Sequence, residues 1–218
     1  MTRTLQFLAF AAVSTAPLQA QSRPGAPDGA TPGGGPLPLG WSANAGAPEN
    51  LSGLKFRTMP PGWHVTTGPT TNLWREADIA AGKFHVTATL IRTQAPAHPE
   101  AYGLLVAGRD MATAPPSYLY FLVRGDGKFM VSRMDAGVRT IVVNWLEHPA
   151  VTKAGAGGES SDLLEIDGKS QGSAIIFRVN GKPVHEIAGA AVNLDGAIGL
   201  RISHNLDVHI KDFAVHKL

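Results

Sequence analysis

Residues 83–91 read KFHVTATLI, and apolar and polar side chains alternate along them. In an extended chain, successive side chains point to opposite faces. One face would carry Phe84, Val86, Ala88 and Leu90, and the other His85, Thr87 and Thr89. This period of two predicts a β-strand with one face in a core and the other toward solvent.

Similar runs continue toward the C-terminus, separated by turn residues. The run 118–124, YLYFLVR, is apolar on both faces, as in a central strand, and Gly125-Asp126-Gly127 predicts a hairpin into 128–133. Asn180-Gly181 predicts a second hairpin, with φ above zero at both positions, and Asp167-Gly168 reads as a turn. Further strands are expected at 102–107, 138–145, 163–166, 174–179, 183–187, 196–203, 206–210 and 212–218, with a loop at 147–161.

These runs predict an all-β fold. Roughly 10–12 short strands at this turn spacing favour an antiparallel β-sandwich of the jelly-roll kind. A closed barrel stays open as an alternative, because barrels and sandwiches both alternate inward and outward side chains. No sequence repeat of blade length is present, which argues against a propeller.

Composition limits the classes of function. The chain has 218 residues, 44% of them hydrophobic, which is enough apolar material for one sizeable core. With 19 basic and 17 acidic side chains the net charge is +2, too little to attract nucleic acid or an anionic membrane surface. The absence of cysteine excludes disulfides, thiolate metal sites and cysteine nucleophiles.

The N-terminal residues read as a signal for export. Arg3 is followed by an apolar stretch, by Pro17, and by small residues that predict cleavage of residues 1–20 after Ala20. The apolar stretch is shorter than the about 20 residues of a membrane span. Residues 21–50 are rich in Pro and Gly and predict a disordered linker, with Trp41 not expected to pack, before a single domain at 51–218. A secreted or periplasmic protein follows from this interpretation.

Several segments carry a family resemblance over residues 55–218. They are Pro61-Gly62-Trp63 to Gly82-Lys83-Phe84, 100–104 (EAYGL), 120–129 (YFLVRGDGKF), 177–181 (FRVNG), 196–201 (GAIGLR) and 208–215. The chain resembles the concanavalin A-like lectin/glucanase sandwiches of secreted bacterial proteins, including the laminin-G-like domain and the 3-keto-disaccharide hydrolase domain. The shared positions are turns and core residues, so the resemblance implies the fold and transfers no catalytic residue.

Catalytic patterns are incomplete. Glucanases of this fold carry Glu-x-Asp-x-x-Glu on one strand, which supplies a nucleophile and an acid/base. Glu165 and Asp167 match the first half, but Ser170 occupies the third acidic position. No Gly-x-Ser-x-Gly sequence is present, so we predict no catalytic residue.

Metal ligation also has little support. His204, Asp207 and His209 lie close in sequence, and the last two share a strand face, but a protein zinc site needs three or four ligands. Asp126 and Asp195 each adjoin a glycine and could serve calcium, although turn chemistry explains both. We expect no metal and no cofactor, with calcium as the alternative.

One strand face carries residues suited to a sugar. Tyr118, Tyr120 and Arg124 share a face by parity, and Tyr102 and Trp145 lie on strands expected nearby. Aromatic rings stack on the apolar faces of sugars, and charged groups bond to hydroxyls. These five residues are the predicted ligand-binding set, for an oligosaccharide or polysaccharide; filling of a core is the alternative role of such aromatic residues.

Three functions therefore remain open. The first, which we predict because no catalytic motif is complete, is a non-catalytic carbohydrate-binding or interaction module. The alternative is a glycoside-processing hydrolase or lyase of the 3-keto-disaccharide hydrolase type. The third is a structural domain of the cell envelope. A cluster of carboxylates facing the 118–124 strand, drawn from Glu100, Asp110 or Glu147, would favour the enzyme.

Overall fold

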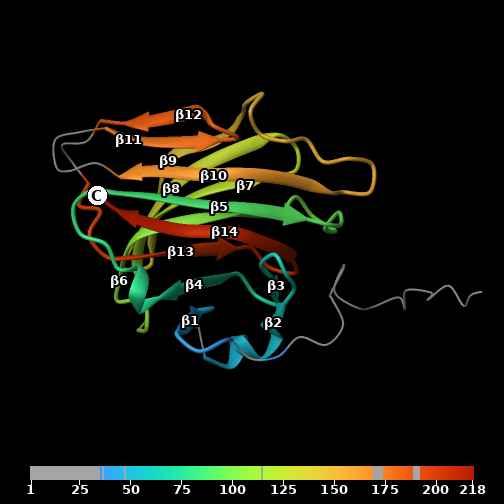
Figure 1. The fold of residues 1–218 in the computed structure, drawn as a ribbon, viewed down its shortest axis with the longest axis horizontal. Coiled ribbons are helices and arrows are strands. Elements are labelled where there is room, and N and C mark those ends of the chain that lie inside the picture. Colours follow the sequence, from blue (N-terminus) through green and yellow to red (C-terminus); the bar gives the residue numbers. More distant parts are fainter. Residues whose placement is uncertain (1–34, 36, 47, 114, 169–173, 189–191) are drawn as a thin grey trace, which may run out of the picture.

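The computed structural model describes residues 35, 37–46, 48–113, 115–168, 174–188 and 192–218. Two antiparallel sheets of seven strands face each other (Figure 1). Sheet I has the order β1 (Trp41–Asn44), β4 (Thr71–Arg75), β13 (Ala197–Ile202), β6 (Ala101–Arg109), β7 (Ser117–Arg124), β8 (Lys128–Asp135) and β9 (Val138–Glu147). Sheet II has the order β12 (Lys182–Ile187), β11 (Ile175–Val179), β10 (Ser160–Gly168), β5 (Phe84–Arg92), β14 (Asp207–Lys217), β3 (Trp63–Thr66) and β2 (Lys55–Thr58). The predicted antiparallel sandwich is confirmed.

The core lies between the sheets and follows from alternation in the strands. Along β5 every second residue is buried, beginning with Phe84, and β10 pairs with it over its whole length and alternates in phase. From sheet I, the inward side chains of β7 are Leu119, Phe121 and Val123. Strands expected from the sequence therefore contribute buried side chains to the core from both sheets.

The β11–β12 hairpin turns at Asn180-Gly181, as predicted. Both residues have positive φ, 51° and 75°, and Val179 pairs with Lys182 across the turn. The other predicted hairpin, β7–β8, closes over Gly125-Asp126-Gly127 with Arg124 opposite Lys128. This pairing leaves a loop of three residues, of which only Gly127 has positive φ.

The expectation of a linker through residue 50 is corrected by β1. The segment 41–44 pairs with β4 at the edge of sheet I, and Trp41 packs on Trp63 with ring centroids 4.7 Å apart. Arg75 also lies over the Trp41 ring at 5.0 Å. The Pro/Gly-rich composition of 21–50 gave no sign of β1, a short strand that aromatic contacts hold against the domain. Residues 1–34, with the predicted signal peptide and cleavage site, lie outside the described residues.

Other strands differ in extent from the expectations. The predicted segments 206–210 and 212–218 form one strand, β14, which is irregular between Lys211 and Ala214. Asp167 and Gly168 lie inside β10, because β5 pairs with both. Strands β2, β3 and β4 are short and had no clear alternation in the sequence.

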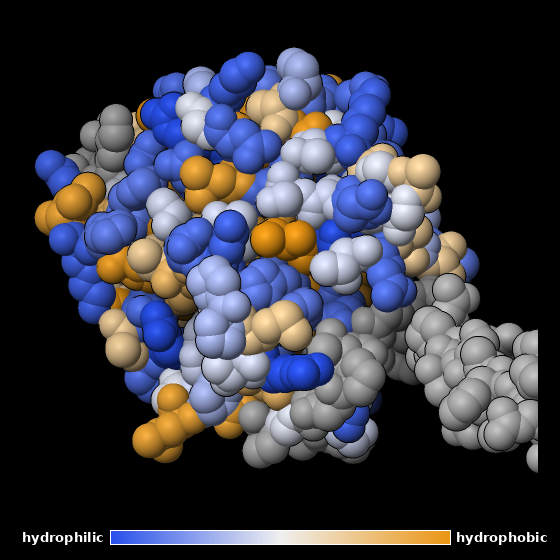
Figure 2. All heavy atoms as spheres, turned by 45° about the vertical axis from the view of Figure 1, so that its right-hand side comes forward, coloured by the Kyte–Doolittle hydropathy of each residue, from blue (hydrophilic) through white to orange (hydrophobic). Residues whose placement is uncertain are grey.

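The surface in Figure 2 is mostly hydrophilic, with scattered hydrophobic residues. Two 3₁₀ helices, η1 (Pro48–Gly53) and η2 (Glu76–Asp78), are the helical elements among the described residues. Over that same part of the chain, no helix is both long and apolar enough to cross a bilayer.

Candidate functional site

The outer face of sheet I, which points away from the core, carries a second apolar cluster. Its buried members come from six segments: Trp74, Ala101, Leu105, Met111, Tyr118, Tyr120, Leu122, Met130 and Ala197. Met134 and Trp145 pack against this cluster and are partly buried. An outer sheet face with this many buried apolar side chains is a platform on which polar groups can be fixed.

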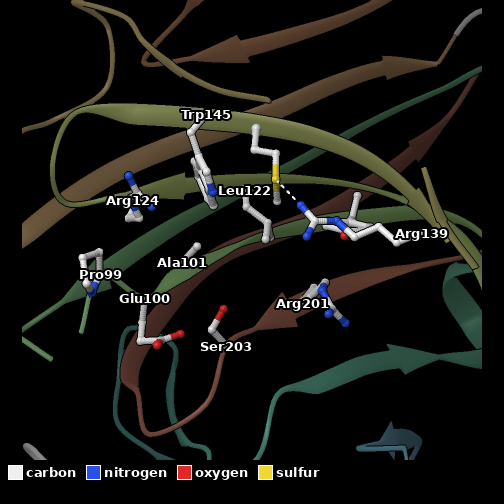
Figure 3. Close-up of a pocket in the computed structure, with 11 residues that line it drawn as sticks. Pro99, Glu100, Ala101, Leu122, Arg124, Arg139, Trp145, Arg201 and Ser203 are labelled. Atoms are coloured by element: carbon white, nitrogen blue, oxygen red, sulfur yellow. Dashed lines mark hydrogen bonds between the residues drawn. The ribbon is translucent and has the colours of Figure 1, made fainter. Parts of the chain in front are cut away.

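Hollows open on this platform, and two of them share one residue, Arg201. The first, shown in Figure 3, is lined by Pro99, Glu100, Ala101, Tyr120, Leu122, Arg124, Met130, Arg139, Trp145, Arg201 and Ser203. The second lies beside it and includes Asn44, Asn72, Tyr118 and Met134. Arg201 lines both hollows and therefore marks the centre of the candidate site.

Arg201 is held rigidly at the centre. Its Nη1 donates hydrogen bonds to Asn72 Oδ1 at 2.9 Å and to the Tyr118 hydroxyl at 2.8 Å. The guanidinium carbon lies 4.9 Å from the centroid of the Tyr120 ring and 5.5 Å from that of Tyr118. Cation–π contact and two neutral acceptors hold the group in place without cancelling its charge.

Space for this arrangement comes from a glycine. Gly103 of β6 lies opposite Arg201 of β13 and opposite Leu122 of β7. A Cβ at Gly103 would lie 2.0 Å from the carbonyl oxygen of Phe121. The absence of a side chain there lets the strands approach closely.

Arg124 is arranged differently from Arg201. Its Nε and Nη2 donate to the two carboxylate oxygens of Asp126 at 2.9 and 2.6 Å, and its guanidinium lies 4.3 Å from the Trp145 ring. The hydrogen bonds from Arg124 hold the pKa of Asp126 below its ordinary value. Arg124 is therefore largely compensated in charge and supports Trp145.

The rim of the first hollow carries further polar groups. Arg139 of the edge strand β9 donates from Nη2 to the sulfur of Met130 at 2.9 Å. Glu100 Oε1 lies 3.0 Å from His204 Nε2. In Figure 3, Arg139 and Arg201 lie toward one end of the hollow, and Arg124 and Trp145 toward the other.

Four of the five predicted ligand-binding residues belong to this face: Tyr118, Tyr120, Arg124 and Trp145. The two tyrosines are only 4% and 2% exposed, so they form the floor beneath Arg201 and offer little open ring surface. Trp145 is half-buried and is the aromatic side chain that the first hollow exposes most.

Tyr102 is the exception and is corrected. It lies opposite Val123, its side chain points into the core, and it is completely buried. Its hydroxyl is 2.9 Å from Ser160 Oγ across the two sheets, and burial raises its pKa to about 12. The parity of β6 relative to β7, which depends on strand register, could not be obtained from one strand alone.

Sequence reasoning missed Arg201 and Arg139 as site residues. A signal for Arg201 existed, because Ile198, Leu200 and Ile202 alternate with it in β13 and are fully buried. The alternation places Arg201 on the outer face. Which other residues share that face depends on β13 pairing with β4 and β6, which are distant in sequence.

The carboxylates needed for an enzyme do not gather here. Of the three residues considered, Glu100 alone lines the first hollow. Glu147 forms an ion pair with Lys153 at 2.6 Å. Glu100 and Asp110 flank the two ends of β6, and a strand of this length separates them by about 30 Å. Glu165 and Asp167 lie on β10 of sheet II, beside His85 and Arg178.

The residues considered for metals have protein partners. His204 pairs with Glu100, Asp207 with His64 at 3.2 Å, and His209 Nε2 lies 3.0 Å from the carbonyl oxygen of Pro61. Asp195 accepts a hydrogen bond from the Gly82 amide at 2.8 Å. Across the described part of the chain, no group of three His, Asp or Glu side chains is arranged for a metal ion.

Known structures share this fold. A carbohydrate-binding module, CBM66 from Bacillus subtilis, matches with a TM-score of 0.60 at 11% identity over 82% of this chain and 96% of that one. A Bacillus subtilis protein of unknown function with a galectin-like fold gives 0.56 at 14% identity, over 81% and 89%. Alginate lyase A1-II′, of polysaccharide lyase family 7, gives 0.54 at 14% identity, over 76% and 84%.

The fold is a concanavalin A-like jelly-roll sandwich. This confirms the fold that the resemblance implied. No protein-family model matches the sequence, and no curated protein matches it. At these identities the likeness concerns the fold alone.

Proposed function

We propose that the outer face of sheet I binds carbohydrate and that the protein is a non-catalytic binding module. The observation that carries this proposal is a hollow lined by the partly exposed Trp145 toward one end and by the fixed guanidinium of Arg201 toward the other. The partly exposed indole of Trp145 supplies a stacking surface, and the guanidinium of Arg201 supplies hydrogen-bond donors for sugar oxygens. Both groups rest on buried apolar side chains.

The similar structures add support of a general kind. One is a carbohydrate-binding module and another is a polysaccharide lyase, so this sandwich serves saccharide recognition in proteins of different activity. The signal-like residues 1–20 suit a secreted or periplasmic location, where polysaccharides are available. Location in that compartment is part of the proposal.

Binding should be measured with the purified protein on a glycan array and then by calorimetry with the best polymer. Trp145→Ala should weaken binding about tenfold or more, because stacking is lost. The matched control is Leu146→Ala on the same strand, where Leu146 lies opposite Phe129 and outside the hollow. No binding of any glycan by the wild type at millimolar concentration would overturn the proposal.

A second candidate, a hydrolase or lyase, draws on Glu100. Its carboxylate, 3.0 Å from His204 Nε2 at the hollow, forms a pair of a kind that can transfer protons. Incubation of the wild type with polysaccharides, followed by an assay for new reducing ends, tests it. Turnover that Glu100→Gln abolishes would replace the binding module with an enzyme.

A further inference from the structure

Arg124 shows how this protein satisfies a guanidinium in the hollow. The Nε and Nη2 edge of Arg124 meets the two oxygens of Asp126 at 2.9 and 2.6 Å. This is the paired geometry in which a planar guanidinium binds a planar carboxylate with two parallel hydrogen bonds. A carboxylate is therefore the acceptor that would fit the Nε and Nη2 edge of Arg201 in the same way.

The corresponding edge of Arg201 meets no acceptor within the described part of the chain. Both of its hydrogen bonds leave from Nη1, toward Asn72 and Tyr118. Among the residues that the structure describes, none accepts a hydrogen bond from Nε or Nη2 of Arg201, and no carboxylate pairs with it. Because Asn72 and Tyr118 already fix the side chain, a ligand need not order it on binding.

A second cation strengthens the local charge. Arg139 lines the same hollow, and its one hydrogen bond within the described part of the chain goes to the Met130 sulfur, a weak acceptor. The acidic residue of the hollow, Glu100, comes three residues before Gly103, the strand partner of Arg201. It therefore lies about 10 Å from Gly103 along the chain, and it is paired with His204. The end that holds Arg139 and Arg201 is therefore positive, while the net charge of the chain is only +2.

We infer that the saccharide bound by this face is acidic, with a carboxylate, as in a uronic acid, received by the open Nε and Nη2 edge of Arg201. This inference rests on the proposed carbohydrate binding and names the class of ligand. Trp145 stacks on a neighbouring sugar ring, and Arg139 attracts the negative charge. A carboxylate is preferred to a sulfate ester because two coplanar oxygens match the coplanar donors of the guanidinium.

The test is to measure, by calorimetry, the affinity of the purified protein for three polymers. Polygalacturonate carries carboxylates, the same polymer after reduction of its carboxyl groups is neutral, and dextran sulfate carries sulfates. We expect polygalacturonate to bind at least about tenfold more tightly than either of the others, in keeping with a paired charged contact. Equal binding of the reduced polymer would overturn the acidic ligand while leaving carbohydrate binding intact.

Variants identify the group responsible. Arg201→Lys keeps the charge but loses the paired donors, so binding of polygalacturonate should fall about tenfold while binding of the reduced polymer changes little. The control is Lys182→Gln, which removes one exposed positive charge on sheet II and should leave both affinities unchanged. Thermal unfolding of each variant checks that the fold is intact.

Other outcomes are also decisive. Polygalacturonate binding that Arg201→Lys leaves unchanged in a folded protein would overturn the role of Arg201. Equal binding of dextran sulfate would show attraction by charge alone and overturn the carboxylate. Absence of binding to all glycans would instead be the failure of the proposed function itself.

Discussion

The guanidinium of Arg201 on β13 donates to the Tyr118 hydroxyl on β7 at 2.8 Å, across the intervening strand β6. The two residues are 83 positions apart in sequence. In the intervening strand β6, the residue opposite Arg201 is Gly103, which has no side chain to fill the space beside the guanidinium. This contact fixes the group that we assign to ligand recognition, and it can be removed by deleting one oxygen.

Tyr118→Phe should therefore weaken saccharide binding severalfold and leave the fold intact. The ring stays in the platform, while Arg201 loses one of its two acceptors and becomes more mobile. Loss of this hydrogen bond should lower the free energy of unfolding by about 1 kcal/mol. Calorimetric binding beside thermal unfolding measures both effects. Unchanged affinity in this variant would show that Asn72 alone positions Arg201.

Tyr120→Ala should destabilise the protein by about 3 kcal/mol or more. The side chain is only 2% exposed and lies beneath Arg201 and beside Tyr118, with ring centroids 5.6 Å apart. Its removal leaves a cavity in the platform, as in a core. Urea unfolding measures the loss. A stable Tyr120→Ala variant with weakened binding would instead identify Tyr120 as an open stacking surface.

Trp41→Ala should lower the free energy of unfolding by about 2–3 kcal/mol, because Trp41 packs on Trp63 and Phe213 and under Arg75. The control is Leu39→Ala, two residues away and fully exposed, which should have no effect. Denaturant unfolding of both variants makes the comparison. If Trp41→Ala behaves like Leu39→Ala, β1 is attached too weakly to count as part of the domain.

Gly181→Val should destabilise by more than about 1 kcal/mol. Its φ of 75° is costly for a β-branched residue, although a Cβ there would meet open space, so the effect is backbone strain. Lys182→Val, at the adjacent exposed strand position, should be nearly neutral. A midpoint of unfolding that Gly181→Val leaves unchanged would show that the turn relaxes to another type.

The pH dependence of stability should reveal Tyr102. Its pKa rises from 10.0 to about 12 on folding, mainly because burial disfavours the phenolate. Below pH 10 the Tyr102 hydroxyl is protonated in both the folded and the unfolded protein, so its full contribution to the free energy of unfolding is present. As the pH rises from about 10 to about 12, the unfolded chain releases this proton first, so stability falls by an amount on the order of 2 kcal/mol.

Tyr102→Phe lacks this titration and is the matched variant. Its free energy of unfolding, compared with the wild type by urea unfolding between pH 9 and pH 12, should decline less steeply. Parallel declines in the two proteins would mean that the Tyr102 hydroxyl reaches water in the folded state. Lysine titration is common to both proteins and cancels in the comparison.

The sequence by itself determined the local elements with a strong period or turn signal. Alternation in 83–91 defined β5, and Asn180-Gly181 defined the turn between β11 and β12, because both depend on neighbouring residues. The same parity placed Tyr118, Tyr120 and Arg124 on one strand face. Short strands such as β1 lacked a period, and their stability comes from contacts with distant aromatic residues.

Tertiary structure alone decided which faces meet. Tyr102 went to the core and Arg201 to the centre of the outer face because of the register of β6 with β7 and of β13 with β4 and β6. Register joins residues separated by tens of positions, and a shift by one residue exchanges the two faces of a strand. The composition of the candidate site was therefore fixed by long-range pairing, which no single stretch of the sequence encodes.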